Sequence, residues 1–227
     1  MRDLNPAAGS DIGTIDFATN GFDPLTATIT LQGGGGGGGS REVEYATSPS
    51  AGVCYYAPLQ FGSLSGNTFT AHGALAGQQQ SGDFHYVTAT EGLKTVSETF
   101  ATRANRTIIF GQTLPTPTIT DITGAGLYRR IRAELTFPAE HNSIATIGLF
   151  DNSGDHGIAA ITTAGWLGGL SVSIEIPDLS GLAGWDDGWA PASSSTTNWG
   201  FTGNGWTGTD CTEGAREVFS TVVGMVG

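Results

Sequence analysis

Paired carboxylates are the first residues to consider for catalysis, because two acids on either side of a glycosidic bond are enough for glycoside hydrolysis. Asp186 and Asp187 are the one adjacent acidic pair in the chain. Neighbouring residues of a strand point to opposite faces, and acids in a turn usually face water. The patterns GxSxG, HExxH and GxxxxGK, which mark common nucleophile, zinc and phosphate sites, are absent. We therefore expect no catalytic residues and a protein that is not an enzyme.

A calcium site is the best local candidate for metal binding. Asp151, Ser153 and Asp155 place oxygen atoms at the first, third and fifth positions of a turn, as a calcium loop does. The match ends there, because His156 stands where an EF-hand has glycine and Thr162 where it has glutamate. The four histidines are scattered rather than set at ligand spacing. We expect an ordinary hairpin turn, without metal or other cofactor, and keep calcium as the alternative.

Tryptophans are the most informative binding candidates, because all five lie after residue 165, most of them among glycines and acids. An indole in a glycine-rich loop either plugs the open end of a sandwich or projects outward, where it stacks on a sugar or anchors a protein partner. We expect Trp185 and Trp189, in the most polar loop, to be the most exposed. The predicted binding residues are Trp185, Asp186, Asp187, Trp189, Trp199 and Trp206.

A second candidate surface is the arginine-rich segment 128–132. It holds three of the eight arginines in a chain with a net charge of -12. Alternation places Arg130 and Arg132 opposite Ile131, either as solvated strand residues or, with Tyr128, as a docking surface for an acidic partner. The same charge balance, with Lys94 as the single lysine, argues against nucleic-acid binding, which needs a dense array of cations.

Composition and cysteine use point to a compartment outside the cytoplasm. Abundant Gly, Ser and Thr with little lysine are typical of exported bacterial proteins, so we expect a periplasmic or extracellular location. Cys54 and Cys211 belong to no CxxC pair and form either one disulfide or two separately buried thiols. No run of eighteen apolar residues occurs, so we expect no transmembrane segment, although the protein can sit at a membrane surface.

Alternation of apolar and polar residues is the dominant pattern, and it predicts an all-β fold. The alternation is clearest over residues 25–31, 131–137 and 170–176, while no segment of a dozen residues keeps a helical period. We predict roughly ten to fifteen short strands in an antiparallel β-sandwich architecture, arranged as two Ig-like sandwiches in tandem. One larger sandwich is the alternative.

Two segments punctuate this pattern. Seven glycines precede Ser40 within residues 33–40; they lack side chains to pack in a strand and are expected to link two strands as a flexible loop, natural or engineered. Pro115 and Pro117 interrupt any strand ladder and suit a connector between domains. We therefore predict an N-terminal sandwich over 1–114 and a tryptophan-rich sandwich over 115–227.

Three segments of the second half are similar to the Ig-like or fibronectin-like sandwiches of bacterial exported lipoproteins and periplasmic proteins. These segments are Leu127–Pro138, Ala164–Leu182 and Gly205–Val223. The similarity lies in strand pattern and composition, and the Cys-Trp-Cys arrangement of antibody domains is missing. The resemblance implies a place outside the cytoplasm and a role in binding or assembly.

Together these features predict a non-enzymatic structural or scaffold protein. It would be an extrinsic subunit that binds and stabilises a larger envelope or membrane complex, for which a photosynthetic or respiratory assembly is one setting. Glycine-rich loops can mould to a protein neighbour, and flanking aromatic residues supply anchor area. A carbohydrate-binding or adhesion module is the first alternative, and a glycoside-active enzyme is the second.

Overall fold

The computed structural model describes residues 23–34, 38–47, 54–208 and 212–227, and it confirms the predicted all-β class. Within these residues, fourteen strands form three sheets. Every strand pair is antiparallel except β1 with β7, which is parallel. Three short helical turns complete the structure: η1 (Ala76–Gln78), α2 (Ala164–Leu167) and η2 (Asp187–Trp189).

One long sheet of eight strands forms the frame, and two small sheets of three strands pack on it. In spatial order the long sheet contains β11 (Gly157–Thr163), β10 (Ile144–Phe150), β13 (Thr197–Thr207), β14 (Arg216–Val226), β6 (Lys94–Phe100), β5 (Phe84–Glu91), β2 (Gly39–Thr47) and β3 (Tyr55–Leu64). The N-terminal small sheet contains β4 (Thr68–Gly73), β1 (Leu25–Gln32) and β7 (Arg106–Ile109). The C-terminal small sheet contains β12 (Ser171–Glu175), β9 (Ile131–Thr136) and β8 (Thr118–Asp121).

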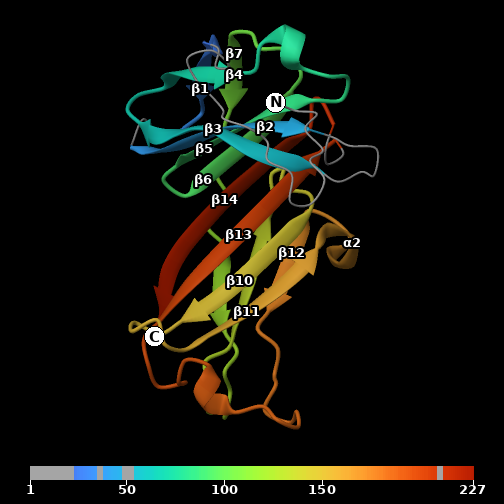
Figure 1. Cartoon of the computed structure of the whole chain (residues 1–227). Helices are drawn as coiled ribbons and strands as arrows, with labels where there is room; N and C mark the ends of the chain where they lie inside the picture. Colours follow the sequence, from blue (N-terminus) through green and yellow to red (C-terminus); the bar gives the residue numbers. More distant parts are fainter. Residues whose placement is uncertain (1–22, 35–37, 48–53, 209–211) are drawn as a thin grey trace, which may run out of the picture.

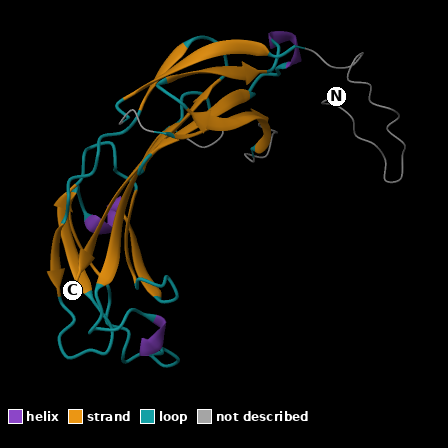
Figure 2. Cartoon of the chain, turned by 90° about the vertical axis from the view of Figure 1, so that its left-hand side faces the viewer, coloured by secondary structure: helices purple, strands orange, loops and turns teal. Residues whose placement is uncertain are grey.

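Strands β13 and β14 join the two halves of the molecule. They pair with each other along their whole length, and the first part of β14 also pairs with β6. The long sheet therefore runs without interruption from β3, in the N-terminal half with the N-terminal small sheet, to β11, in the C-terminal half with the C-terminal small sheet. Figures 1 and 2 show the result as a curved body with one half at each end.

Two hydrophobic clusters lie between the sheets. One is built from residues of the first half of the chain together with Val218 of β14, and the other includes Trp199, Phe201 and Phe137 of the C-terminal half. Val222 and Val226 of β14 pack against this second cluster. Because these β14 residues are spaced by four, they point to one face of the strand. Both small sheets therefore cover the same face of the long sheet.

The opposite face of the long sheet has no described sheet packed on it, and we call it the outer face. Val223 and Met225 of β14 point there and are 61% and 71% exposed. Polar pairs from neighbouring strands lie on the same face, such as the hydroxyl groups of Thr202 and Thr221, which are 2.9 Å apart. An antiparallel sheet with one packed face and one solvated face accounts for the alternation in the sequence.

The structure bears differently on the two predictions made from the glycine run and from the prolines. The glycine run connects β1 to β2, although residues 35–37 lie outside the described residues. Gly39 is nevertheless the first residue of β2, where a Cβ atom would collide with the carbonyl oxygen of Thr90, so a glycine fits that ladder. The predicted boundary between 114 and 115 stays a prediction. The two hydrophobic clusters are separate, but one continuous sheet joins them.

Candidate interaction surface

Strand β11 is the C-terminal edge of the long sheet and pairs with β10 alone among the described strands. Its hydrogen-bond pattern follows from the two ends of the hairpin. The amide of Ala164 donates to the carbonyl of Ser143 at 2.9 Å, and the amide of Asp151 donates to the carbonyl of His156 at 3.1 Å. In an antiparallel ladder, residues that face their partner strand alternate with residues that face away. The even-numbered residues of β11 therefore bond to β10.

The odd-numbered residues consequently direct their backbone N–H and C=O groups to the open side of the edge. These residues are Gly157, Ala159, Ile161 and Thr163, and all four are exposed. An edge of this kind is a template for another strand, and proteins usually protect it with charged residues, proline or a bulge. The seven residues of β11 include neither a charge nor a proline, and their register with β10 is regular.

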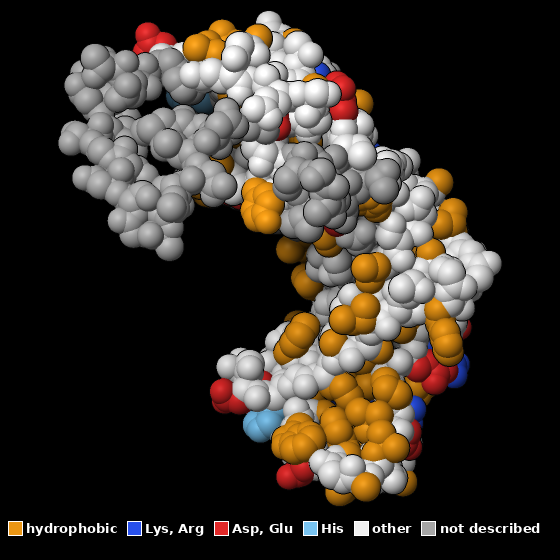
Figure 3. Space-filling view, turned by 45° about the vertical axis from the view of Figure 1, so that its right-hand side comes forward, with side chains coloured by type: hydrophobic (Ala, Val, Ile, Leu, Met, Phe, Trp, Pro, Cys, Tyr) orange, Lys and Arg blue, Asp and Glu red, His pale blue; other side chains and the backbone are white. Residues whose placement is uncertain are grey.

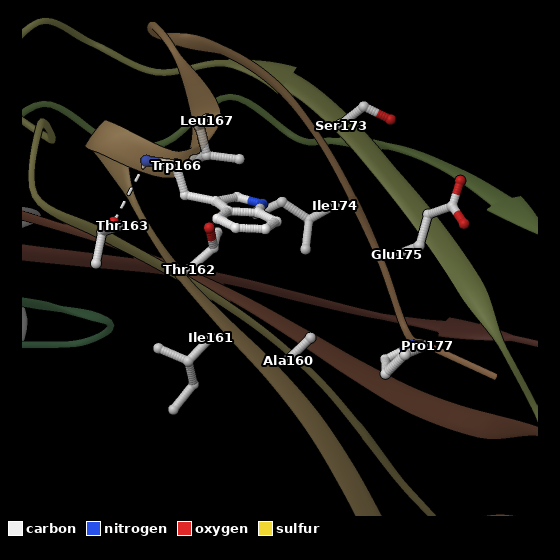
Figure 4. Close-up of a pocket in the computed structure, with 10 residues that line it drawn as sticks. All are labelled: Ala160, Ile161, Thr162, Thr163, Trp166, Leu167, Ser173, Ile174, Glu175 and Pro177. Atoms are coloured by element: carbon white, nitrogen blue, oxygen red, sulfur yellow. Dashed lines mark hydrogen bonds between the residues drawn. The ribbon is translucent and has the colours of Figure 1, made fainter. Parts of the chain in front are cut away.

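A groove of about 530 Å³ separates β11 from β12, the facing edge of the C-terminal small sheet. Figure 4 shows its lining, which comes from both strands and from the α2 turn. Ile161 and Trp166 are its most exposed apolar residues, at 72% and 84%. Ser173 and Glu175 of β12 add polar groups on the other side. The open side of the C-terminal sandwich is thus mainly apolar, with a polar margin.

The sequence fixes Trp166 at the groove through the short α2 turn. The side chain of Thr163 accepts a hydrogen bond from the amide of Trp166, which caps the start of the turn. Gly168 ends it with a left-handed backbone at φ +70°, a conformation that favours glycine. The indole is therefore held at the surface by its backbone, while its ring lies across the groove (Figure 4).

A second apolar area lies on the outer face beside β11. The ring of Phe150 lies over Gly148, where a Cβ atom would come within 2.7 Å of it, and close to Gly200 of the neighbouring strand. Phe150 is 45% exposed, and Val223 and Met225 extend the area along β14. Figure 3 shows hydrophobic side chains gathered on the lower half of the molecule. Exposed apolar residues that lie together, as these do, are often found at interaction sites.

The tryptophan prediction needs correction at three positions. Trp199 is only 6% exposed and belongs to the C-terminal core, because the expected glycine-rich loop is strand β13 and its odd-numbered residues face inward. Trp185 is half-buried and packs against Tyr128 at a ring distance of 5.5 Å. Trp189 is 56% exposed, but Trp166, which the prediction left out, is more exposed than either.

The carboxylates beside these tryptophans hold their own loop together. The side chain of Asp187 accepts from the indole N–H of Trp185 at 2.8 Å, and that of Asp186 accepts from the amide of Gly188 at 2.9 Å. The rings of Trp185 and Trp189 meet edge to face at 83°. They therefore do not form a flat platform. Trp206 is half-buried, and its indole N–H donates to the carbonyl of Gly208 at 3.0 Å.

The three residues predicted to form the arginine-rich docking surface make contacts within the chain. Tyr128 is 1% exposed, so its predicted place on a docking surface is wrong; its hydroxyl donates to the carbonyl of Pro177 at 3.0 Å. Arg132 pairs with Glu175 of β12, with 2.6 Å between Nε and Oε1. Arg130 donates from Nε to the carbonyl of Ile176 at 3.1 Å. These contacts bind β9 to β12 and its continuation.

The calcium candidate is a hydrogen-bonded turn. One oxygen of the Asp151 carboxylate accepts from the hydroxyl of Ser153 at 2.9 Å and from the amide of Asp155 at 3.1 Å. The other oxygen lies 2.6 Å from Nδ1 of His156. The bond from His156, together with those from the turn, holds the pKa of Asp151 well below its usual range. In the described part of the chain, no three His, Cys, Asp or Glu residues converge as a metal site would require.

The structure describes one of the two cysteines. Cys54 is disulfide-bonded, and no free cysteine is found among the described residues. Cys211 lies outside the described residues. The pairing of Cys54 with Cys211 therefore stays a prediction.

Sequence reasoning missed the features that make up the candidate surface. Trp166 is one of the five tryptophans but is not among the predicted binding residues, and nothing in the sequence alone marks Ile161 as exposed. The available signal was the absence of charge and proline over residues 157–163, next to the tryptophan. That signal becomes specific only when β11 is known to be an edge.

Comparisons with known proteins give no family for this chain: no family model matches it, and no curated protein matches it either. Among the described residues, no helix has the length and hydrophobicity needed to cross a membrane.

Proposed function

We propose that the chain is a non-enzymatic structural or scaffold protein that binds a partner protein through its C-terminal half. The observation that carries this proposal is the unprotected edge of β11 beside the apolar groove with Trp166. A partner strand on this edge gains backbone hydrogen bonds, and the groove gives its side chains apolar contact. Aromatic anchors such as Trp166 commonly carry much of the binding energy of an interface.

The setting of this scaffold follows from composition. We place it outside the cytoplasm, in the periplasm or extracellular space, as an extrinsic subunit of an envelope or membrane complex, with a photosynthetic or respiratory assembly as one setting. The low lysine content and the similarity of its strand pattern to Ig-like or fibronectin-like exported lipoproteins support this proposal. The disulfide at Cys54 supports it further, because disulfides persist in oxidising compartments.

A photo-crosslinking amino acid at position 161 tests the proposal in the cells that make the protein. Leu93, in the turn between β5 and β6, is 53% exposed and provides a matched control far along the sheet from β11. We expect a protein adduct at position 161 to be about tenfold more abundant than at position 93. Equal adducts at the two positions, or none at 161, would reject a partner-binding role for the groove.

Sugar binding is the second candidate, favoured by one observation. Trp166 is 84% exposed in a groove that Ser173 and Glu175 also line, and an exposed indole face can stack on a sugar ring. Tryptophan fluorescence during titration with neutral oligosaccharides measures this directly. Saturable quenching that disappears in Trp166→Ala would favour sugar binding over the protein partner, and an unchanged signal would remove it.

A further inference from the structure

We infer that a second copy of this chain occupies the open edge, by antiparallel pairing of β11 with β11. The inference rests on the proposed function, because both place a partner on the same edge, and it names that partner. Such a pair has twofold symmetry, in which one surface meets itself. The two long sheets would then continue into each other across the axis.

The backbone of β11 restricts the register of this pairing. Residues on the odd-numbered positions offer their N–H and C=O groups to the open side, so odd positions must exchange hydrogen bonds with odd positions. The register that uses all seven residues places Ala160 on the axis, Ala159 opposite Ile161, and Gly157 opposite Thr163. It also keeps the core-facing residues of both copies on the same face.

Charge permits a second copy at this strand more readily than elsewhere on the surface. The chain carries a net charge of -12, so most pairs of its surfaces repel each other. The segment 157–163 contains no charged residue, and self-pairing therefore brings no like charges into direct opposition there. Other strand edges of the described residues differ: β12 ends with Glu175, and β8 ends with Asp121.

The side chains beside the strand fit the same arrangement. In this register Ile161 of each copy packs across the strand boundary against Ala159 of the other, on the outer face. The two copies of Ile161, each 72% exposed in the single chain, are diagonal neighbours across the axis. Trp166 follows Thr163 and so lies beyond the paired segment, near the start of β11 in the second copy. The apolar residues of the edge are thus covered together.

Analytical ultracentrifugation of the full chain tests this inference with one disruptive variant and one control. We expect the wild-type chain to approach twice its 23.3 kDa mass at high concentration. Ile161→Glu sets carboxylates close to each other across the axis and should raise the dimer dissociation constant at least about tenfold. Leu93→Glu adds the same charge at an exposed position in the turn between β5 and β6, outside the candidate surface, and should leave the dissociation constant within about twofold.

A compensating variant makes the test specific for self-pairing. In Ala159→Lys/Ile161→Glu, each new lysine lies opposite a new glutamate of the other copy, so we expect most of the lost affinity to return at low salt and to fall again at high salt. The affinity for a strand of a different protein would not be restored by this double substitution. Both positions are exposed, so we expect each variant to fold. Circular dichroism checks this.

Three outcomes would overturn the inference: a monomer at all concentrations up to about 1 mM, equal effects of Ile161→Glu and Leu93→Glu, or no rescue by the double variant. The crosslinking experiment separates this failure from failure of the proposed function. A monomer that still gives an adduct of a different protein at position 161 keeps the scaffold role and rejects self-pairing. A monomer without any adduct at that position rejects both.

Discussion

The two edges of the long sheet, β3 and β11, differ in how they meet a potential partner strand. Strand β3 carries Pro58, and its pairing with β2 shifts register at a bulge between Val43 and Glu44. The side chain of Gln60 accepts a hydrogen bond from the amide of His72, which ties β3 to β4, the facing edge of the N-terminal small sheet. Strand β11 has no proline and no bulge, and the groove separates it from its facing edge.

Exposed hydrophobic residues do not distinguish these two edges. Tyr55 and Phe61 of β3 are 64% and 65% exposed, about as much as Ile161 of β11. The difference lies in the backbone, because proline lacks a donor and a bulge breaks the repeat that a new strand would follow. The β11 edge therefore differs from the β3 edge in its regular, unblocked backbone more than in its side chains.

We expect the largest effect from proline substitutions in β11, which distinguish backbone groups that bond to β10 from backbone groups that face the open side. Ala160→Pro removes an N–H that donates to β10 and leaves an acceptor unpaired, so we expect the free energy of unfolding to fall by about 3 kcal/mol. Ile161→Pro removes an N–H that faces the open side and should cost about 1 kcal/mol or less, because proline is tolerated there. Urea unfolding followed by tryptophan fluorescence measures both values.

The same two variants bear on self-association. Ile161→Pro should abolish pairing of β11 with β11, since it blocks the odd-numbered donor in the middle of the strand. If both proline variants cost the same stability, the assignment of odd residues to the open side is wrong, and with it the register proposed for the dimer.

The second largest effect concerns the N-terminal half of the long sheet, which contains the β3 edge. His85 of β5 is fully buried there. Its ring stacks on Phe100 at 5.8 Å, and its Nε2 accepts a hydrogen bond from the amide of Ala74 at 3.2 Å. Burial, with the nearby positive charge of Arg103, lowers the pKa of His85 to about 4. The histidine is therefore neutral in the folded chain at neutral pH.

The sign of the pH dependence follows from this lowered pKa. Below its unfolded pKa of 6.5, the unfolded chain binds a proton that the folded chain refuses until about pH 4. The stabilising contribution is thus complete above pH 6.5 and is lost as pH falls toward 4, by roughly 3 kcal/mol. Thermal unfolding between pH 7.5 and 4.5 should show a flatter pH dependence in His85→Gln than in the wild type. Parallel curves for the two proteins would contradict this assignment.

The fold was predictable from the sequence where the pattern is local. The alternating segments 25–31, 131–137 and 170–176 overlap strands β1, β9 and β12, because half-burial of a sheet requires a period of two. Strands β4 and β8 give a weaker signal, since they are only six and four residues long. The continuous eight-stranded sheet could not be predicted, because β14 pairs with β6 across more than a hundred residues of sequence.

The candidate site was harder to predict, for a different physical reason. Trp199 alternates with Gly200, and Gly203 and Gly205 follow, so a strand that carries three glycines resembles a glycine-rich loop in the sequence. The partner of Arg132 is Glu175, which lies on another strand, so a paired arginine resembled a free cation. Burial and pairing of this kind depend on contacts between distant segments, which composition and spacing do not encode.

We expect the smallest effect from a substitution that makes the β3 edge resemble the open β11 edge. Pro58→Thr restores a backbone donor on β3 and should change the free energy of unfolding by no more than about 0.5 kcal/mol, as exposed substitutions usually do. Made in the Ile161→Glu background, it isolates β3, because pairing through β11 is already disrupted. We expect weak self-association to appear, measured as a twofold to threefold rise in light scattering at about 100 μM. Unchanged scattering would mean that the bulge and the Gln60 contact block β3 without the proline, so that Pro58 is not needed for the difference between the two edges.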